Sequence, residues 1–283
     1  MVQGKSKSIN QHLSEIADMT LLNGTLTECM GLIHGKIGIA IYFFYYAQYT
    51  GNMLFADYAM DLIEKTQSQI HLDSPSDYEK GLAGIGVGID YLVRNKYLIV
   101  DDDVCEDFDY RMYRAVMSDP WQSFGLYDGL VGYGKYWITR LCHQTPAKYA
   151  QECLMYIIKQ IKKNFPFIPV EEQNDVYCFL YDLKEISGFE SSIDILKLCE
   201  RWDLSSFIRL GHSVTGNIGR IFQHNYYFNN SLKGDPEIDL SLISDINKNK
   251  SPVSMGLLNG YAGEGLLRLS FLHQMNRSWI LLL

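Results

Sequence analysis

Zinc in proteins is bound by cysteine, histidine and carboxylate side chains. One formal set of three such residues in this chain is Asp175, Cys178 and His212. Two other carboxylates, Asp90 and Asp128, come closest to the pair that cleavage of a glycosidic bond requires. What any of these residues can do depends on the elements that bring them together.

Two combinations of residues are disfavoured as functional sites by their positions along the chain. Asp90 lies several residues deeper in its predicted helix than Asp128, so we do not expect the two carboxylates to flank one sugar bond. The dipeptide Cys142-His143 lies ten residues beyond Gly132. At the helical rise, this places it about 15 Å from the glycine end of its helix. We therefore interpret the dipeptide as a helix terminus.

The elements follow from a pair of glycines at spacing three that occurs five times, each time before a predicted helix. The pairs are Gly35-Lys-Ile-Gly38, Gly81-Leu-Ala-Gly84, Gly129-Leu-Val-Gly132, Gly216-Asn-Ile-Gly219 and Gly260-Tyr-Ala-Gly263. The steps between them are 46, 48, 87 and 44 residues, so the long step hides one degenerate copy. Such a period is typical of a helical hairpin, and the chain is predicted to hold about six units of roughly 45 residues.

Each unit is predicted to contain one inner and one outer helix. Residues 39–47 are apolar or aromatic on every side, as in a helix buried all round, whereas residues 53–70 keep their apolar side chains on one face. A lead-in helix carrying Ile9, Leu13 and Ile16 precedes them. The same alternation predicts inner helices at 85–93, 134–141, 177–186, 218–227 and 266–272, outer helices at 104–117, from 145 to about 166, and at 193–202, and a long loop at 229–251. No strand-like alternation competes, so we predict an all-α fold.

Composition limits the class of protein. The 283 residues are expected to form a single domain, because stacked repeats share one core. A net charge of -8 without a basic run argues against a nucleic-acid partner. The first residues lack an apolar segment and no apolar run reaches 18 residues, so we expect neither a signal peptide nor a membrane span, and a cytoplasmic location. Six scattered cysteines are expected to be reduced.

The repeated glycines allow two interpretations. Small residues are a packing requirement wherever helices converge. Alternatively, the inner helices direct their N-termini, with unpaired N–H groups and positive dipole ends, at one central mouth where a ligand binds. In both interpretations successive hairpins close into a ring.

Three segments resemble the lanthionine synthetase C-like (LanC-like) family. They are Gly31-Leu-Ile-His34-Gly35-Lys-Ile-Gly38, Gly125-Leu-Tyr-Asp128-Gly129-Leu-Val-Gly132-Tyr-Gly134 and Gly256-Leu-Leu-Asn-Gly260-Tyr-Ala-Gly263-Glu-Gly265. The final residues 276–283 also resemble the closing segment of that family. The resemblance implies an α/α toroid of six to seven helical hairpins. It also implies zinc-dependent addition of a peptide cysteine thiol to dehydroalanine or dehydrobutyrine.

The resemblance further implies a set of site residues. Cys178 matches the cysteine of the family's Trp-Cys-x-Gly element, and His212 matches the histidine of its Cys-His-Gly element, so these two would bind the zinc. Glycine, Gly211, stands where the second element has its thiolate. Asp175 is the nearest candidate in the sequence for a substitute ligand. Asp128 is the counterpart of the family's proton-transferring aspartate. His212 would be a catalytic residue as well as a zinc ligand.

Two functions remain open at this stage. One is a peptide cyclase of this family, with zinc as its cofactor and a peptide as its substrate. The other is a noncatalytic scaffold that binds a peptide or a partner modifying enzyme and has lost the zinc site. A prenyltransferase-like use of Asp175, Cys178 and His212 is not supported by the surrounding repeats. His34, which precedes a glycine of the first repeat, is interpreted mainly as structural.

Overall fold

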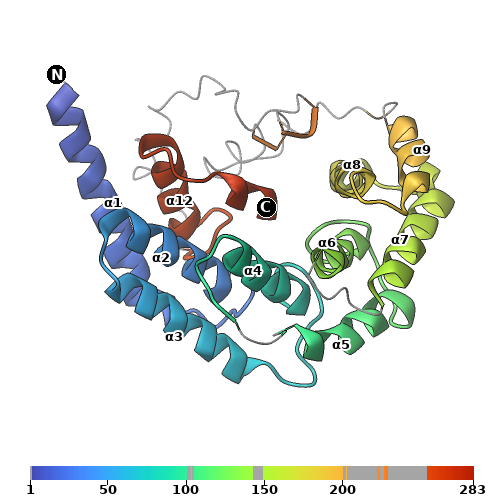
Figure 1. Ribbon diagram of the computed structural model, residues 1–283, viewed down its shortest axis with the longest axis horizontal. Coiled ribbons are helices and arrows are strands. Elements are labelled where there is room, and N and C mark those ends of the chain that lie inside the picture. Colours follow the sequence, from blue (N-terminus) through green and yellow to red (C-terminus); the bar gives the residue numbers. More distant parts are fainter. Residues whose placement is uncertain are drawn as a thin grey trace. The chain divides into compact units, whose positions relative to one another are not determined.

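The computed structural model describes residues 2–100, 103, 105–142, 149–199, 202, 222–223, 226–228 and 254–283, with side chains from His12 onward. Every regular element in this part of the chain is a helix, which confirms the all-α prediction (Figure 1). No helix among the described residues combines the length and apolar character needed to cross a bilayer. The chain divides into two compact units, unit 1 with residues 1–72 and 208–283, and unit 2 with residues 73–207.

Unit 1 is built from both ends of the chain. Its elements are α1 (Val2–Gly24), α2 (Lys36–Thr50), α3 (Leu54–Gln69), α12 (Tyr261–Leu272) and the 3-10 helix η4 (Ser278–Leu282). Helices α2 and α3 pack together as the predicted hairpin, α12 packs against α2, and α1 packs against α12. The contrast between inner and outer helices is confirmed, because α2 is buried continuously from Lys36 to Ala47 whereas α3 buries only four residues of one face.

Unit 2 continues the alternation. Its elements are α4 (Leu82–Arg94), α5 (Glu106–Met117), α6 (Leu130–Leu141), α7 (Ala150–Asn164), η1 (Phe165–Phe167), α8 (Val170–Lys184) and α9 (Glu190–Cys199). Helix α6 packs against α4 and α8, the other two inner helices of this unit. Helix α8 begins seven residues before its predicted start at Tyr177. The predicted helix 218–227 and loop 229–251 lie largely outside the described residues.

Four inner helices begin with the same seven-residue loop. We name these loops L1 (29–35), L2 (75–81), L3 (123–129) and L6 (254–260). In each, the N–H of the first helical residue donates to the carbonyl seven residues earlier: Lys36 to Cys29 (3.0 Å), Leu82 to Pro75 (2.9 Å), Leu130 to Ser123 (3.1 Å) and Tyr261 to Ser254 (3.0 Å). The loop backbone thereby pairs a helix N–H that would otherwise have no intrahelical partner.

The first glycine of each pair is required because the loop leaves no room for a side chain at that position. It adopts an extended backbone that any residue can take, with φ between -107° and -128°. A Cβ atom on Gly35 would lie 2.6 Å from the carbonyl oxygen of Cys29, and one on Gly81 would lie 2.2 Å from that of Pro75. The loop therefore folds back so tightly on the helix start that a side chain cannot fit.

Neighbouring loops are joined by a recurrent pair of backbone hydrogen bonds. In unit 2, the N–H groups of Tyr78 and Glu79 in L2 donate to the carbonyl of Tyr127 in L3 at 3.0 and 3.1 Å. In unit 1, Leu257 and Leu258 in L6 donate to Ile33 in L1 at 2.7 and 3.3 Å. The donors and acceptors occupy the same positions of the loop in both units, so L6 is joined to L1 in the way that L2 is joined to L3.

A further glycine lets adjacent inner helices approach closely. It is the fifth residue of α4, α6 and α12, and a Cβ atom there would lie within 2.7 Å of an aromatic ring on the next inner helix. The pairs are Gly86 with Tyr136, Gly134 with Phe179, and Gly265 with Tyr42. Tyr136 and Tyr42 are each the seventh residue of their helix. The packing of one inner helix on the next is therefore also a repeated unit.

Helices α5 and α6 are held by a buried ion network. Arg140 of α6, 4% exposed, donates to the carboxylates of Asp103 and Asp109, with Nη2 contacts of 2.6 and 2.8 Å. The hydroxyl of Tyr136 donates to Asp109 at 2.7 Å, and burial raises the pKa of this phenol. Each of these charges therefore depends on the others for pairing.

Replacing Gly134 by alanine should destabilise the protein by about 1–3 kcal/mol, because the added methyl overlaps the Phe179 ring. Urea unfolding measures this cost. In a Phe179→Leu background the same substitution should cost clearly less, since the smaller side chain leaves room. Strictly additive effects in this double-mutant cycle would contradict the proposed contact.

Replacing Arg140 by methionine should cost about 3–5 kcal/mol, because it leaves two carboxylates mostly buried without their cation. Arg114→Met is the matched control. Arg114 pairs with Asp119 at 3.5 Å with both side chains about half exposed, so its loss should cost less than about 1 kcal/mol. Equal changes in the urea midpoint of the two variants would show that the network does not hold the helices.

Candidate functional site

The predicted site residues that the structure describes lie in unit 2. Asp128 lies in L3 and Cys178 lies in the middle of α8. His212 lies outside the described residues, as does His143, and Cys142 is the exposed C-cap of α6. Asp90, the other carboxylate considered for glycosidase chemistry, pairs with Arg94 one turn later on α4 at 2.5 Å.

Cys178 is a buried thiol beside an ion pair. Its exposure is 9%, and burial raises its pKa well above the ordinary value, with the cation of Lys135 as the largest opposing influence. Lys135 of α6 binds Asp182, one turn beyond Cys178 on α8, through a contact of 2.5 Å. The raised pKa favours the neutral thiol, whereas the thiolate is the form that acts as nucleophile and metal ligand.

Asp128 is an exposed carboxylate oriented by its own loop. Its Oδ1 accepts a hydrogen bond from the hydroxyl of Ser123 at 2.7 Å, and the same hydroxyl oxygen accepts the N–H of Gly125 at 3.2 Å. The hydrogen bond between Leu130 and Ser123 ties this serine to the start of α6. The carboxylate is therefore presented from a hydrogen-bonded loop at a helix N-terminus.

Two carboxylates of α8 hold L3 against that helix. Asp175 accepts the N–H of Leu126 at 2.8 Å, and Glu172 accepts the N–H of Phe124 at 2.8 Å. These contacts bring the loop of Asp128 and the helix of Cys178 together. Sequence reasoning considered Asp175 as a substitute zinc ligand and missed Glu172; in the structure Asp175 is a hydrogen-bond acceptor for a backbone 49 residues away.

A complete zinc site is not assembled by the described residues. No three histidine, cysteine or carboxylate side chains in this part of the chain are grouped to hold a metal ion. Of the two expected ligands, Cys178 is described and His212 is not. The zinc site therefore stays a prediction.

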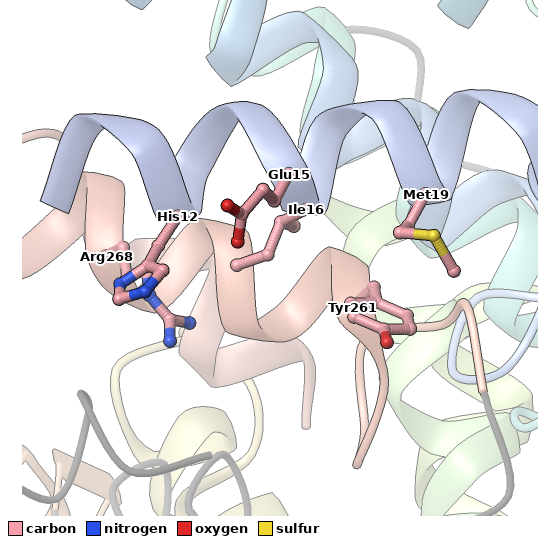
Figure 2. Close-up of a pocket in the computed structure, with 6 residues that line it drawn as sticks. All are labelled: His12, Glu15, Ile16, Met19, Tyr261 and Arg268. Atoms are coloured by element: carbon pink, nitrogen blue, oxygen red, sulfur yellow. The ribbon is translucent and has the colours of Figure 1, made fainter. Parts of the chain in front are cut away.

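Unit 1 contains a separate small pocket of about 120 Å³ between α1 and α12 (Figure 2). His12, Glu15, Ile16 and Met19 line it from α1, and Tyr261 and Arg268 line it from α12. Arg268 is buried and pairs with Glu264 at 2.9 Å. The pocket contains none of the predicted site residues, and the spacing of His12 and Glu15 on one helical face was its only sequence signal.

Neither a comparison with models of protein families nor a search of curated protein sequences gave a match.

The pKa of Glu172 predicts a pH-dependent change in stability. Burial raises this pKa, the hydrogen bond from Phe124 opposes the rise, and the carboxylates of Asp128 and Glu171 add to it. Since the folded protein holds the proton more tightly than the unfolded chain, ionisation of Glu172 costs stability as the pH rises through its raised pKa. The protonated form carries no such cost at lower pH.

Glu172→Gln should therefore gain stability relative to the wild-type protein when the pH is raised from about 4 to about 7, because glutamine keeps an acceptor oxygen and cannot ionise. Urea midpoints of both proteins at the two pH values measure the gain. Glu185→Gln, at the exposed C-cap of the same helix, is the control. An identical difference between Glu172→Gln and wild type at both pH values would refute the expected linkage.

Proposed function

We propose that this chain is a LanC-like protein that acts in peptide modification of the lanthipeptide type, with its hairpins closed into an α/α toroid. The observation that carries the proposal is the loop shared by four inner helices. Three of these loops, L1, L3 and L6, contain glycine motifs through which the sequence resembles the family, and L6 binds L1 with the same hydrogen bonds that join L2 to L3. A last repeat that is joined to the first in this way is expected of a closed ring of repeats.

The chemistry proposed for the family is addition of a peptide cysteine thiol to dehydroalanine or dehydrobutyrine. Cys178 and His212 are the residues of this chain that would hold zinc, and bound there zinc would lower the pKa of a substrate thiol. Asp128 is suited to proton transfer because it is exposed and oriented by Ser123. A bound peptide would then be presented to the N-terminal ends of the inner helices.

A second candidate is a noncatalytic scaffold that binds a peptide or a partner modifying enzyme. Two observations favour it. Glycine occupies the third ligand position at Gly211, and Asp175, the nearest substitute ligand, accepts the backbone N–H of Leu126. A catalytic zinc normally has three protein ligands. The two candidates share the proposed fold and differ in whether the metal is held.

Metal analysis of the purified full chain by mass spectrometry separates the two candidates. The catalytic candidate predicts about one zinc per chain, lost in both Cys178→Ala and His212→Ala, because each removes one of few ligands. Cys153→Ala is the matched control, since Cys153 is a fully buried thiol on α7. Zinc retained in the Cys178 variant, or absent from the wild-type protein, would exclude the catalytic candidate and leave the scaffold.

A further inference from the structure

The packing of α8 on α6 locates the repeat that the sequence hides. In the other inner-helix pairs, the aromatic residue that packs on the preceding glycine is the seventh residue of its helix, Tyr136 in α6 and Tyr42 in α2. Phe179 makes the equivalent contact with Gly134, but it is the tenth residue of α8. Helix α8 therefore begins three residues earlier than its equivalents, and Gln173 occupies the position of their first residue.

This alignment identifies what replaced the missing glycine pair. The two glycines of a pair lie one residue before and two residues after the first residue of the inner helix, as Gly129 and Gly132 do around Leu130. In the fourth repeat these positions are Glu172 and Asp175, at the same spacing of three. The long step then divides into 43 residues from Gly129 to Glu172 and 44 from Glu172 to Gly216, close to the other steps.

The loop backbone that the pair replaces would have accepted hydrogen bonds. Leu126 is the fourth residue before α6, the position that Tyr78 has before α4 and Leu257 has before α12. The N–H groups of Tyr78 and Leu257 donate to a carbonyl of the next loop. Because α8 extends into the region where its loop would lie, the N–H of Leu126 meets the carboxylate of Asp175 instead.

We propose that Glu172 and Asp175 are positioning residues for L3. The carboxylate of Asp175 replaces the backbone acceptor of the missing fourth loop at Leu126, that of Glu172 holds the N–H of Phe124, and together they fix the loop that carries Asp128. The placement of L3 follows from the two hydrogen bonds alone. The consequence for proton transfer by Asp128 rests on the proposed function. Buried or half-buried N–H groups left without an acceptor are costly, so the carboxylates are needed wherever the loop backbone is absent.

Amide hydrogen exchange tests the proposal on the full chain without any peptide or metal. Asp175→Ala should accelerate exchange of the Leu126 amide by about tenfold or more, because its acceptor is lost. Asp175→Asn should keep most of the protection, since the side-chain amide oxygen can still accept the bond. Glu172→Ala and Glu172→Gln should behave in the same way at the Phe124 amide. Circular dichroism melts establish that each variant is folded.

Two controls make the result specific. Glu171→Ala removes an exposed carboxylate of the same helical turn and should leave both amides protected. The Leu257 amide, which bonds to L1 in unit 1, should be unchanged in every variant. Unchanged Leu126 exchange in Asp175→Ala would overturn the proposal, as would equal acceleration in the alanine and asparagine variants. If Asp175→Ala does not fold, the asparagine variant and the Glu172 pair still decide the question.

The outcome is independent of the proposed function. Exchange rates report the placement of L3 whether or not the protein binds zinc or a peptide. If the wild-type protein binds neither zinc nor a peptide while the Leu126 and Phe124 amides exchange as expected, the proposed function alone is contradicted. If the variants accelerate exchange at other amides instead, the positioning role alone is contradicted.

Discussion

Every inner helix in the described part of the chain has to find acceptors for the N–H groups of its first turn and of the loop before it, and this constraint determines much of the structure. Four helices meet it with a loop that folds back onto the helix start, at the cost of excluding side chains from the first glycine position. The loops then pair with one another through the same kind of bond. Backbone hydrogen bonds, rather than side-chain caps, organise the starts of these inner helices.

The same constraint explains how the fourth repeat can differ in sequence and still fit. Asp175 accepts the N–H group that a loop carbonyl accepts elsewhere, and Glu172 accepts that of Phe124. Acidic residues in the first turn of α8 also interact favourably with the positive end of its dipole. The repeat therefore lacks the glycine pair without leaving the neighbouring loop unpaired. Its aromatic contact with the preceding helix, Phe179 on Gly134, corresponds to those of Tyr136 on Gly86 and Tyr42 on Gly265.

Features with local causes could be predicted from the sequence. The glycine pairs and the contrast between α2 and α3 identified the hairpins, because spacing and amphipathicity depend only on residues that are close together in the sequence. The predicted start of α8 was wrong, since the prediction relied on apolar residues and overlooked the acidic first turn. The roles of Asp175 and Lys135 were out of reach, because each meets a partner more than 40 residues away in the chain. Cys178 was singled out by resemblance, but its burial beside an ion pair depends on α6.

The division of unit 1 into two segments has a consequence for how the protein is made. Tyr42 of α2 packs on Gly265 of α12, and α1 packs on the same helix, so these early helices lack their partner until the final residues have been synthesised. Unit 2 is continuous and is complete once residue 207 has left the ribosome. Domains generally fold as they emerge during translation. The middle of this chain is thus able to fold first. The apolar surface of α2 that packs on α12 stays exposed until the end of translation.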